Sequence, residues 1–150
     1  MYKIQDSLVI NKPIDIVFEF FNTPKNLSLI TPSYMHFNLL TPDPIVMKEG
    51  AVFDYSITIM GLPIRWTSLI VDYDPPYSFV DIQLQGPHSY WHHAHTFTKH
   101  DEGTLITDTV HLLMPFGIVG KLGYHLLAKH LNNALFSHRK NVVANYFKNY

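Results

Sequence analysis

Residues 86–97 read GPHSYWHHAHTF, and the fold of the chain can be inferred outward from this stretch. Side chains alternate between the two faces of a strand, so a strand here places Trp91, His93, His95 and Phe97 on one face. A packed core does not require the two imidazoles, because burying a polar group costs free energy unless the group is paired. A concave apolar surface with a few polar groups is typical of a small-molecule pocket.

The segments on both sides of this stretch show the same alternation of apolar and polar residues. We predict a meander of about five antiparallel strands over residues 52–60, 64–73, 78–85, 88–100 and 104–114. Turn residues separate them, at Gly61-Leu62-Pro63, Asp74-Pro75-Pro76, Gly86-Pro87 and Asp101-Glu102-Gly103. A further strand is predicted over residues 3–11, and a short one over residues 36–40.

Helices are predicted before and after the meander. Pro13 suits the first position of a helix, which carries apolar residues at helical spacing at Ile14, Val17, Phe18 and Phe21. A second short helix is predicted over residues 25–30. Apolar residues recur at helical spacing from about 118 to 147, which predicts a helix of roughly 30 residues and about 45 Å. Gly120 and Gly123 weaken its first turns.

These elements predict an α+β fold in which a curved antiparallel sheet wraps around the long C-terminal helix, with two short helices after the first strand. The space between such a sheet and its helix is often too wide for side chains to fill, and a cavity then remains. At 150 residues the chain is expected to form one domain, residues 1–150.

Composition excludes several classes of function. Apolar residues make up 47% of the chain and aromatic residues 14%, which is ample for a packed core. The net charge is −1 and the longest basic run is Arg139-Lys140, so the signature of a nucleic-acid-binding protein is absent. Without cysteine there is no disulfide, thiol nucleophile or thiolate metal site. No signal peptide or transmembrane run is apparent, and we expect a cytoplasmic protein without membrane insertion.

The register of the last predicted hairpin follows from its turn. If His100 pairs with Gly103, the numbers of paired residues sum to 203. The pairs are then Trp91 with Leu112, His93 with Val110, His95 with Asp108, and Phe97 with Ile106. A slip of one residue would mix the apolar face with the polar face, so burial favours this register.

The predicted pair of His95 and Asp108 has three interpretations. A carboxylate beside an imidazole fixes its tautomer and favours its charged form. The favoured interpretation is a structural pair or one that orients a ligand, and the second is general-base catalysis. The third is a metal site in which His93 and His95 chelate an ion and Asp108 is the third ligand. Nothing in the sequence selects a metal over a hydrogen bond, so we assign neither a metal nor a cofactor.

Other candidate residues come from the preceding strands. Tyr55 and Trp66 are predicted to face inward, and Gln83 shares a face of its strand with Asp81, although the pattern leaves open which face is inside. Arg139 is interpreted as a surface or ion-pair residue. The predicted ligand-binding set is therefore Trp91, His93, His95, Phe97, Asp108, Tyr55, Trp66 and Gln83. The serines lie in no nucleophile elbow, and no phosphate-binding glycine motif is present.

The chain resembles the helix-grip (SRPBCC) superfamily, which includes START domains, birch-pollen-allergen-like (Bet v1-like) proteins and polyketide cyclase/dehydrase-like proteins. Within it, the chain is most similar to a bacterial subgroup that binds ligands. The resemblance covers nearly the whole chain. Its motifs are Trp91-x-His93-x-His95-x-Phe97, Pro13–Phe21, Asn26-Leu27 with Thr31-Pro32, Gly61-Leu62-Pro63 with Trp66, Phe79-Val80-Asp81 with Gln83, Gly86-Pro87, Gly103-Thr104, Asp108, Pro115-x-Gly117 and Phe136-x-x-Arg139. Leu112 and His138 stand where aromatic residues, often Tyr, are expected.

The resemblance implies an internal cavity for a small hydrophobic or aromatic molecule. We expect a binding or carrier protein that orients this molecule with His93, His95 and Asp108. The alternative is a cyclase- or dehydratase-type enzyme. In that enzyme His95, assisted by Asp108, abstracts a proton next to a carbonyl and His93 polarises the oxygen. Related domains occur fused to epimerase-like Rossmann domains, so a separate epimerase-like chain is a candidate partner.

Overall fold

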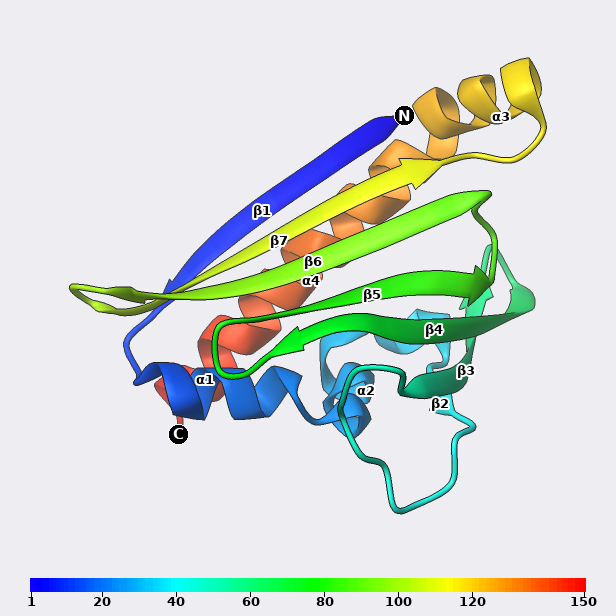
Figure 1. The fold of residues 1–150 in the computed structure, drawn as a ribbon. Coiled ribbons are helices and arrows are strands. Elements are labelled where there is room, and N and C mark those ends of the chain that lie inside the picture. The colour runs from blue at the N-terminus through cyan, green and yellow to red at the C-terminus, as the bar shows by residue number, and fades with distance from the viewer.

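A computed structural model describes residues 1–150, and its main feature is one curved sheet of seven antiparallel strands (Figure 1). The strand order is β1-β7-β6-β5-β4-β3-β2. The strands are β1 (Tyr2–Ile10), β2 (Asn38–Leu39), β3 (Val52–Ile59), β4 (Leu62–Asp74), β5 (Ser78–Gln85), β6 (Tyr90–His100) and β7 (Gly103–Leu113). Every predicted strand is confirmed to within two residues of its bounds.

The register of the β6–β7 hairpin is confirmed as predicted. Trp91 pairs with Leu112 and His95 pairs with Asp108, and the paired numbers sum to 203 along the hairpin. Gly103 has a φ of 129°, and a Cβ atom at this position would overlap the backbone that leaves β1. The absence of a side chain therefore lets the β1 end pack against the hairpin turn.

The turn between β3 and β4 is shorter than predicted. Met60 and Gly61 have φ values of 52° and 79°, which is the geometry of a two-residue hairpin turn with both central residues left-handed. Leu62 and Pro63 already belong to β4, where they pair with Ile59 and Thr58. The prediction that both residues lie in the turn is therefore wrong, because two residues are enough to reverse the chain.

Four short helical segments lie between β1 and β2. They are α1 (Ile14–Phe21), η1 (Pro24–Asn26), α2 (Leu27–Ile30) and η2 (Ser33–Met35). The predicted helix over residues 25–30 is thus split between η1 and α2. The apolar spacing predicted that Phe21 would join Ile14, Val17 and Phe18 on the buried face of α1. In the structure Phe20 is the fourth buried residue, and Phe21 is half-buried. Phe20 contacts Phe147 near the C-terminus, which explains its burial.

The predicted long C-terminal helix is confirmed as a continuous helical segment of 32 residues. It consists of α3 (Gly117–Gly123), a π-helical turn (Tyr124–Ala128) and α4 (Lys129–Lys148). The π turn follows Gly123 directly, at the point where the sequence predicts weakened helix. In Figure 1, α4 runs diagonally across one face of the sheet. None of the helices is both long and apolar enough to span a bilayer.

Buried apolar side chains form two clusters on the face of the sheet that α4 covers. The first contains Ile10, Ile14, Val17, Phe18, Phe20, Ile30, Phe53, Ile70, Phe79, Phe97, Ile106, Val143 and Phe147. The second contains Ile57, Trp66, Trp91, Val110, Leu112, Tyr124 and Phe136. His95 stacks on Phe79 of the first cluster, with ring centroids 4.2 Å apart, and His93 lies edge-on to Trp91 of the second. The two imidazoles therefore lie between the clusters.

Candidate ligand-binding site

A cavity of about 410 Å³ lies between the sheet and the C-terminal helix. Most of its lining residues are apolar, and on the helix side they include Leu127, Leu131 and Leu135. A few polar side chains are grouped among them, notably Asp81 and Arg139. This volume lies within the range of about 300–1,000 Å³ that is typical of small-molecule sites. The cavity is therefore large enough for a molecule of several rings.

An aromatic panel covers the sheet side of the cavity. Trp66 and Trp91 meet edge to face with ring centroids 5.2 Å apart, and Tyr55 stacks on Trp66 at 5.9 Å. Burial and the charge of Asp81 raise the pKa of the Tyr55 phenol, so its hydroxyl stays protonated at neutral pH. The panel therefore presents apolar ring faces together with neutral polar edges.

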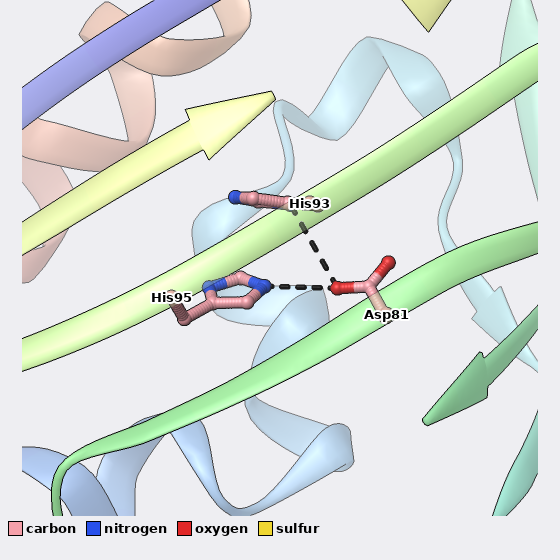
Figure 2. Close-up of side chains that lie close together, drawn as sticks. All are labelled: Asp81, His93 and His95. Carbon is pink, nitrogen blue, oxygen red and sulfur yellow. Dashed lines mark hydrogen bonds and ion pairs between the residues drawn. The ribbon is translucent and has the colours of Figure 1, made fainter. Parts of the chain in front are cut away.

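Two carboxylates flank the paired imidazoles of β6. His93 Nε2 donates a hydrogen bond to Asp108 Oδ1 at 2.8 Å, and His95 Nε2 donates one to Asp81 Oδ2 at 2.9 Å. The two imidazole rings lie close together, with centroids 3.7 Å apart and their planes tilted by 32°. Figure 2 shows both imidazoles beside the Asp81 carboxylate, which lies 3.8 Å from His93 Nδ1. His95 Nδ1 lies 3.0 Å from Asp108 Oδ1, at an angle that makes no hydrogen bond.

The electrostatics of this network shift the pKa values of its two histidines in opposite directions. Burial raises the pKa of Asp108 and of Asp81, but hydrogen bonds and charges from the imidazoles outweigh it and hold both pKa values below the usual range. Burial lowers the pKa of His93, and the charge of His95 lowers it further, against the opposing carboxylates. For His95 burial also lowers the pKa, but the two carboxylates outweigh burial and raise it. His95 is thus the more basic imidazole of the two and His93 the less basic one.

Arg139 of α4 lies on the helix side of the same network. Its Nη1 is 3.9 Å from Asp108 Oδ1, and its guanidinium carbon is 5.4 Å from the ring centroid of Phe136. Nε and Nη1 of Arg139 are buried without a hydrogen-bond partner, as are Trp66 Nε1 and Asn132 Nδ2. All three of these residues line the cavity. These cavity-lining residues therefore carry buried hydrogen-bond donors that no protein acceptor uses.

No protein-family model and no curated protein matches the chain. Several solved structures do. One is CV1439 from Chromobacterium violaceum, with a TM-score of 0.76, 11% identity and 97% of each chain covered. The Zhui aromatase/cyclase from Streptomyces sp. R1128 has a TM-score of 0.76 and 16% identity over 98% of this chain and 93% of that one. Major latex-like protein 151 from Panax ginseng has a TM-score of 0.70, 17% identity and 97% of each chain covered.

The chain has the helix-grip fold. The resemblance inferred from the sequence motifs is thereby confirmed at the level of the fold. Identities of 11–17% show no more than that. The residues of the chain itself decide what it binds or catalyses.

Five of the eight residues predicted to bind ligand line the helix-grip cavity. They are Trp91, His93, His95, Tyr55 and Trp66. Phe97 does not line it, because the ring is buried in the first apolar cluster. Asp108 lies behind the two imidazoles, and Gln83 is used in holding the backbone of His88. These three residues support the cavity wall from behind or beside it.

The sequence does not predict the place of two polar residues of the site, Asp81 and Arg139. The face of Asp81 is not predicted from the sequence, because it depends on the register of β5 with β6, which makes Asp81 the cross-strand partner of His93 and Phe79 that of His95. Arg139 was interpreted as a surface or ion-pair residue. Its side chain is 14% exposed and close to Asp108, so the ion-pair interpretation is right and the surface one is wrong. The sequence feature that points to Arg139 is the motif Phe136-x-x-Arg139.

Because His88 is partly buried at the cavity wall, we expect the stability of the fold to depend on pH. Burial lowers the pKa of His88 to about 4, whereas in the unfolded chain the group protonates near pH 6.5. The free energy of unfolding therefore decreases as the pH falls from about 6.5 to about 4, and is unaffected by this group above 6.5. Between pH 7 and pH 4.5, the free energy of unfolding of the wild type should decrease by about 2–3 kcal/mol more than that of a His88→Asn variant. Urea unfolding at both pH values tests this, and a difference that does not change with pH would contradict it.

Proposed function

We propose that the chain binds a small hydrophobic or aromatic molecule in this cavity, as a binding or carrier protein. The observation that carries the proposal is the combination of apolar walls with buried donors that have no protein partner. A buried polar group without a hydrogen bond costs about 1–3 kcal/mol. A ligand that brings acceptor atoms to these donors offsets this cost, which a packed core cannot do.

The positions of these donors indicate the chemistry of the ligand. Asn132 and Arg139 are seven residues apart on α4, and therefore lie about 10 Å apart along one side of the helix. Trp66 offers its indole N–H from the sheet. The ligand that suits this arrangement has a flat apolar body, which packs on the aromatic panel, and oxygen acceptors near its ends.

The test uses the position of the two tryptophans. Trp66 and Trp91 are the only tryptophans of the chain, and both line the cavity. Titration with 1-anilinonaphthalene-8-sulfonate, an aromatic molecule with oxygen acceptors, should change the tryptophan fluorescence saturably at one molecule per chain. Native mass spectrometry of the freshly purified protein should also detect a bound mass of a few hundred daltons, an estimate from the size of such ligands.

Matched variants on the C-terminal helix distinguish the cavity from the surface. Ala128 lines the cavity, and an Ala128→Phe substitution fills part of it. Ala134 is exposed on the same helix and is the control. We expect Ala128→Phe to weaken probe binding at least about tenfold, which is about 1.4 kcal/mol, and Ala134→Phe to leave it unchanged. Equal affinity of both variants, or binding of many probe molecules per chain, would overturn the proposal.

The second candidate function is a cyclase- or dehydratase-type enzyme, favoured by the two imidazoles at the cavity wall, whose pKa values shift in opposite directions. These directions favour the reverse of the roles predicted from the sequence. His93, with the lowered pKa and with Nδ1 outside its hydrogen bond to Asp108, suits the general base, whereas His95, with the raised pKa, suits the group that polarises a carbonyl oxygen. In that case a His93→Gln variant should retain probe binding and lose turnover. Loss of binding and turnover together would favour the carrier function.

A further inference from the structure

Three metal-ligating atoms converge at one side of the cavity. They are Asp81 Oδ2, His93 Nδ1 and His95 Nε2, all within 4.8 Å of one another. His93 and His95 share one face of β6 because they are two residues apart, and Asp81 is the cross-strand partner of His93 on β5. Figure 2 shows the Asp81 carboxylate opposite both imidazoles. We propose that these three residues bind a divalent transition-metal ion of the zinc class.

The hydrogen bond behind His93 prepares this residue as a ligand. Its Nε2 is 2.8 Å from Asp108 Oδ1, and an ionised carboxylate only accepts, so Nε2 carries the proton. Nδ1 is therefore the ring nitrogen that faces Asp81 Oδ2, at 3.8 Å. At this distance the two atoms make no hydrogen bond with each other. A cation in this position makes both contacts favourable.

His95 faces the same two carboxylates, with a hydrogen bond to one of them. Its Nε2 hydrogen-bonds Asp81 Oδ2 at 2.9 Å, and its Nδ1 lies 3.0 Å from Asp108 Oδ1 without a hydrogen bond. A metal ion takes the place of the proton that now joins Nε2 to Asp81. Asp108 then lies against the outer nitrogen of both imidazoles. Carboxylates that orient metal-binding histidines in this way are common outside the ligand set of protein metal sites.

The donor set and its surroundings determine the kind of ion. Two imidazoles and one carboxylate, without thiolate, suit Zn²⁺, Fe²⁺, Co²⁺ or Cu²⁺ better than Mg²⁺ or Ca²⁺, which prefer oxygen. Ligand bonds of about 2.0–2.1 Å require the donor atoms to be about 3.3 Å apart in a tetrahedral site. Asp81 Oδ2 lies 2.9 Å from His95 Nε2 and 3.8 Å from His93 Nδ1, and the ligand atoms of the three residues all lie within 4.8 Å of one another. Since all three ligands line the cavity, the remaining coordination position is open to water or to a bound molecule.

This inference does not depend on the proposed function, because the ion binds to protein groups alone. The test is uptake of Zn²⁺ by the full chain after treatment with a chelator, measured by calorimetry and by elemental analysis. We expect one Zn²⁺ per chain and a higher unfolding temperature with Zn²⁺. Co²⁺ in place of Zn²⁺ should give visible absorption bands, which report a site with nitrogen and oxygen ligands.

The variants separate this site from the histidines on the other face of the sheet. Asp81→Asn keeps the shape of the side chain and should weaken Zn²⁺ binding at least about 100-fold. His95→Asn, a second variant in case the first does not fold, should do the same. The control is His92→Gln, since His92 lies on the other face of β6 and faces His111, with ring centroids 6.3 Å apart. No uptake by the wild type, or uptake lost in His92→Gln but kept in Asp81→Asn, would overturn the inference.

Discussion

An Asp108→Ala variant is expected to lose about 3–5 kcal/mol of the free energy of unfolding, because it removes one partner from a buried charged network. Asp108 is 8% exposed. Its carboxylate accepts the hydrogen bond from His93, contacts His95 and lies 3.9 Å from the guanidinium of Arg139. Without it, the His93 N–H, the His95 imidazole and the Arg139 guanidinium lose the carboxylate that lies against all three.

Urea unfolding at neutral pH measures this loss. The matched control is Asp43→Ala, which removes an exposed ion pair with Lys25. The distance from Lys25 Nζ to Asp43 Oδ2 is 2.8 Å, the same as that from His93 Nε2 to Asp108 Oδ1. An exposed pair contributes less than about 1 kcal/mol, so the control should stay close to the wild type. A similar small effect in both variants would mean that the network around Asp108 does not stabilise the fold.

A Phe97→Ala variant should also lose about 3–5 kcal/mol of the free energy of unfolding, but should keep the affinity of the folded protein for ligand. The Phe97 side chain is 2% exposed and contacts the rings of Phe18 and Phe21, at centroid distances of 5.2 and 5.4 Å. Its truncation leaves a void in the first apolar cluster. Phe97 itself does not line the cavity, so its truncation removes no contact with a ligand.

Two measurements separate these effects. Urea unfolding gives the loss of stability, and binding of the naphthalene probe below the unfolding temperature gives the affinity. Thr96→Ala, an exposed position next in sequence on β6, should change the stability by no more than about 0.5 kcal/mol. If Phe97→Ala remained as stable as the control and lost its affinity, Phe97 would belong to the cavity wall and not to the core.

The pattern of residues was sufficient to predict the register and the buried face of β6. Strict alternation has a period of two, so a register slip of one residue would have moved His93 and His95 to the solvent face. Local geometry therefore decided which side chains share a face. It did not decide what each meets there, since Trp91 lines the cavity while Phe97, six residues along the same face, is buried under α1.

The sequence by itself determined the order of the elements, the pairing of β6 with β7 and the position of two imidazoles among aromatic rings. Only the tertiary structure decided that Asp81 and Arg139 join them. Asp81 is brought in by the β5–β6 register, and Arg139 by the path of α4 across the sheet. These contacts join residues of different elements, and the pairing of β5 with β6 and the packing of α4 on the sheet decide them. Periodicity reports only neighbours along one strand or one helix.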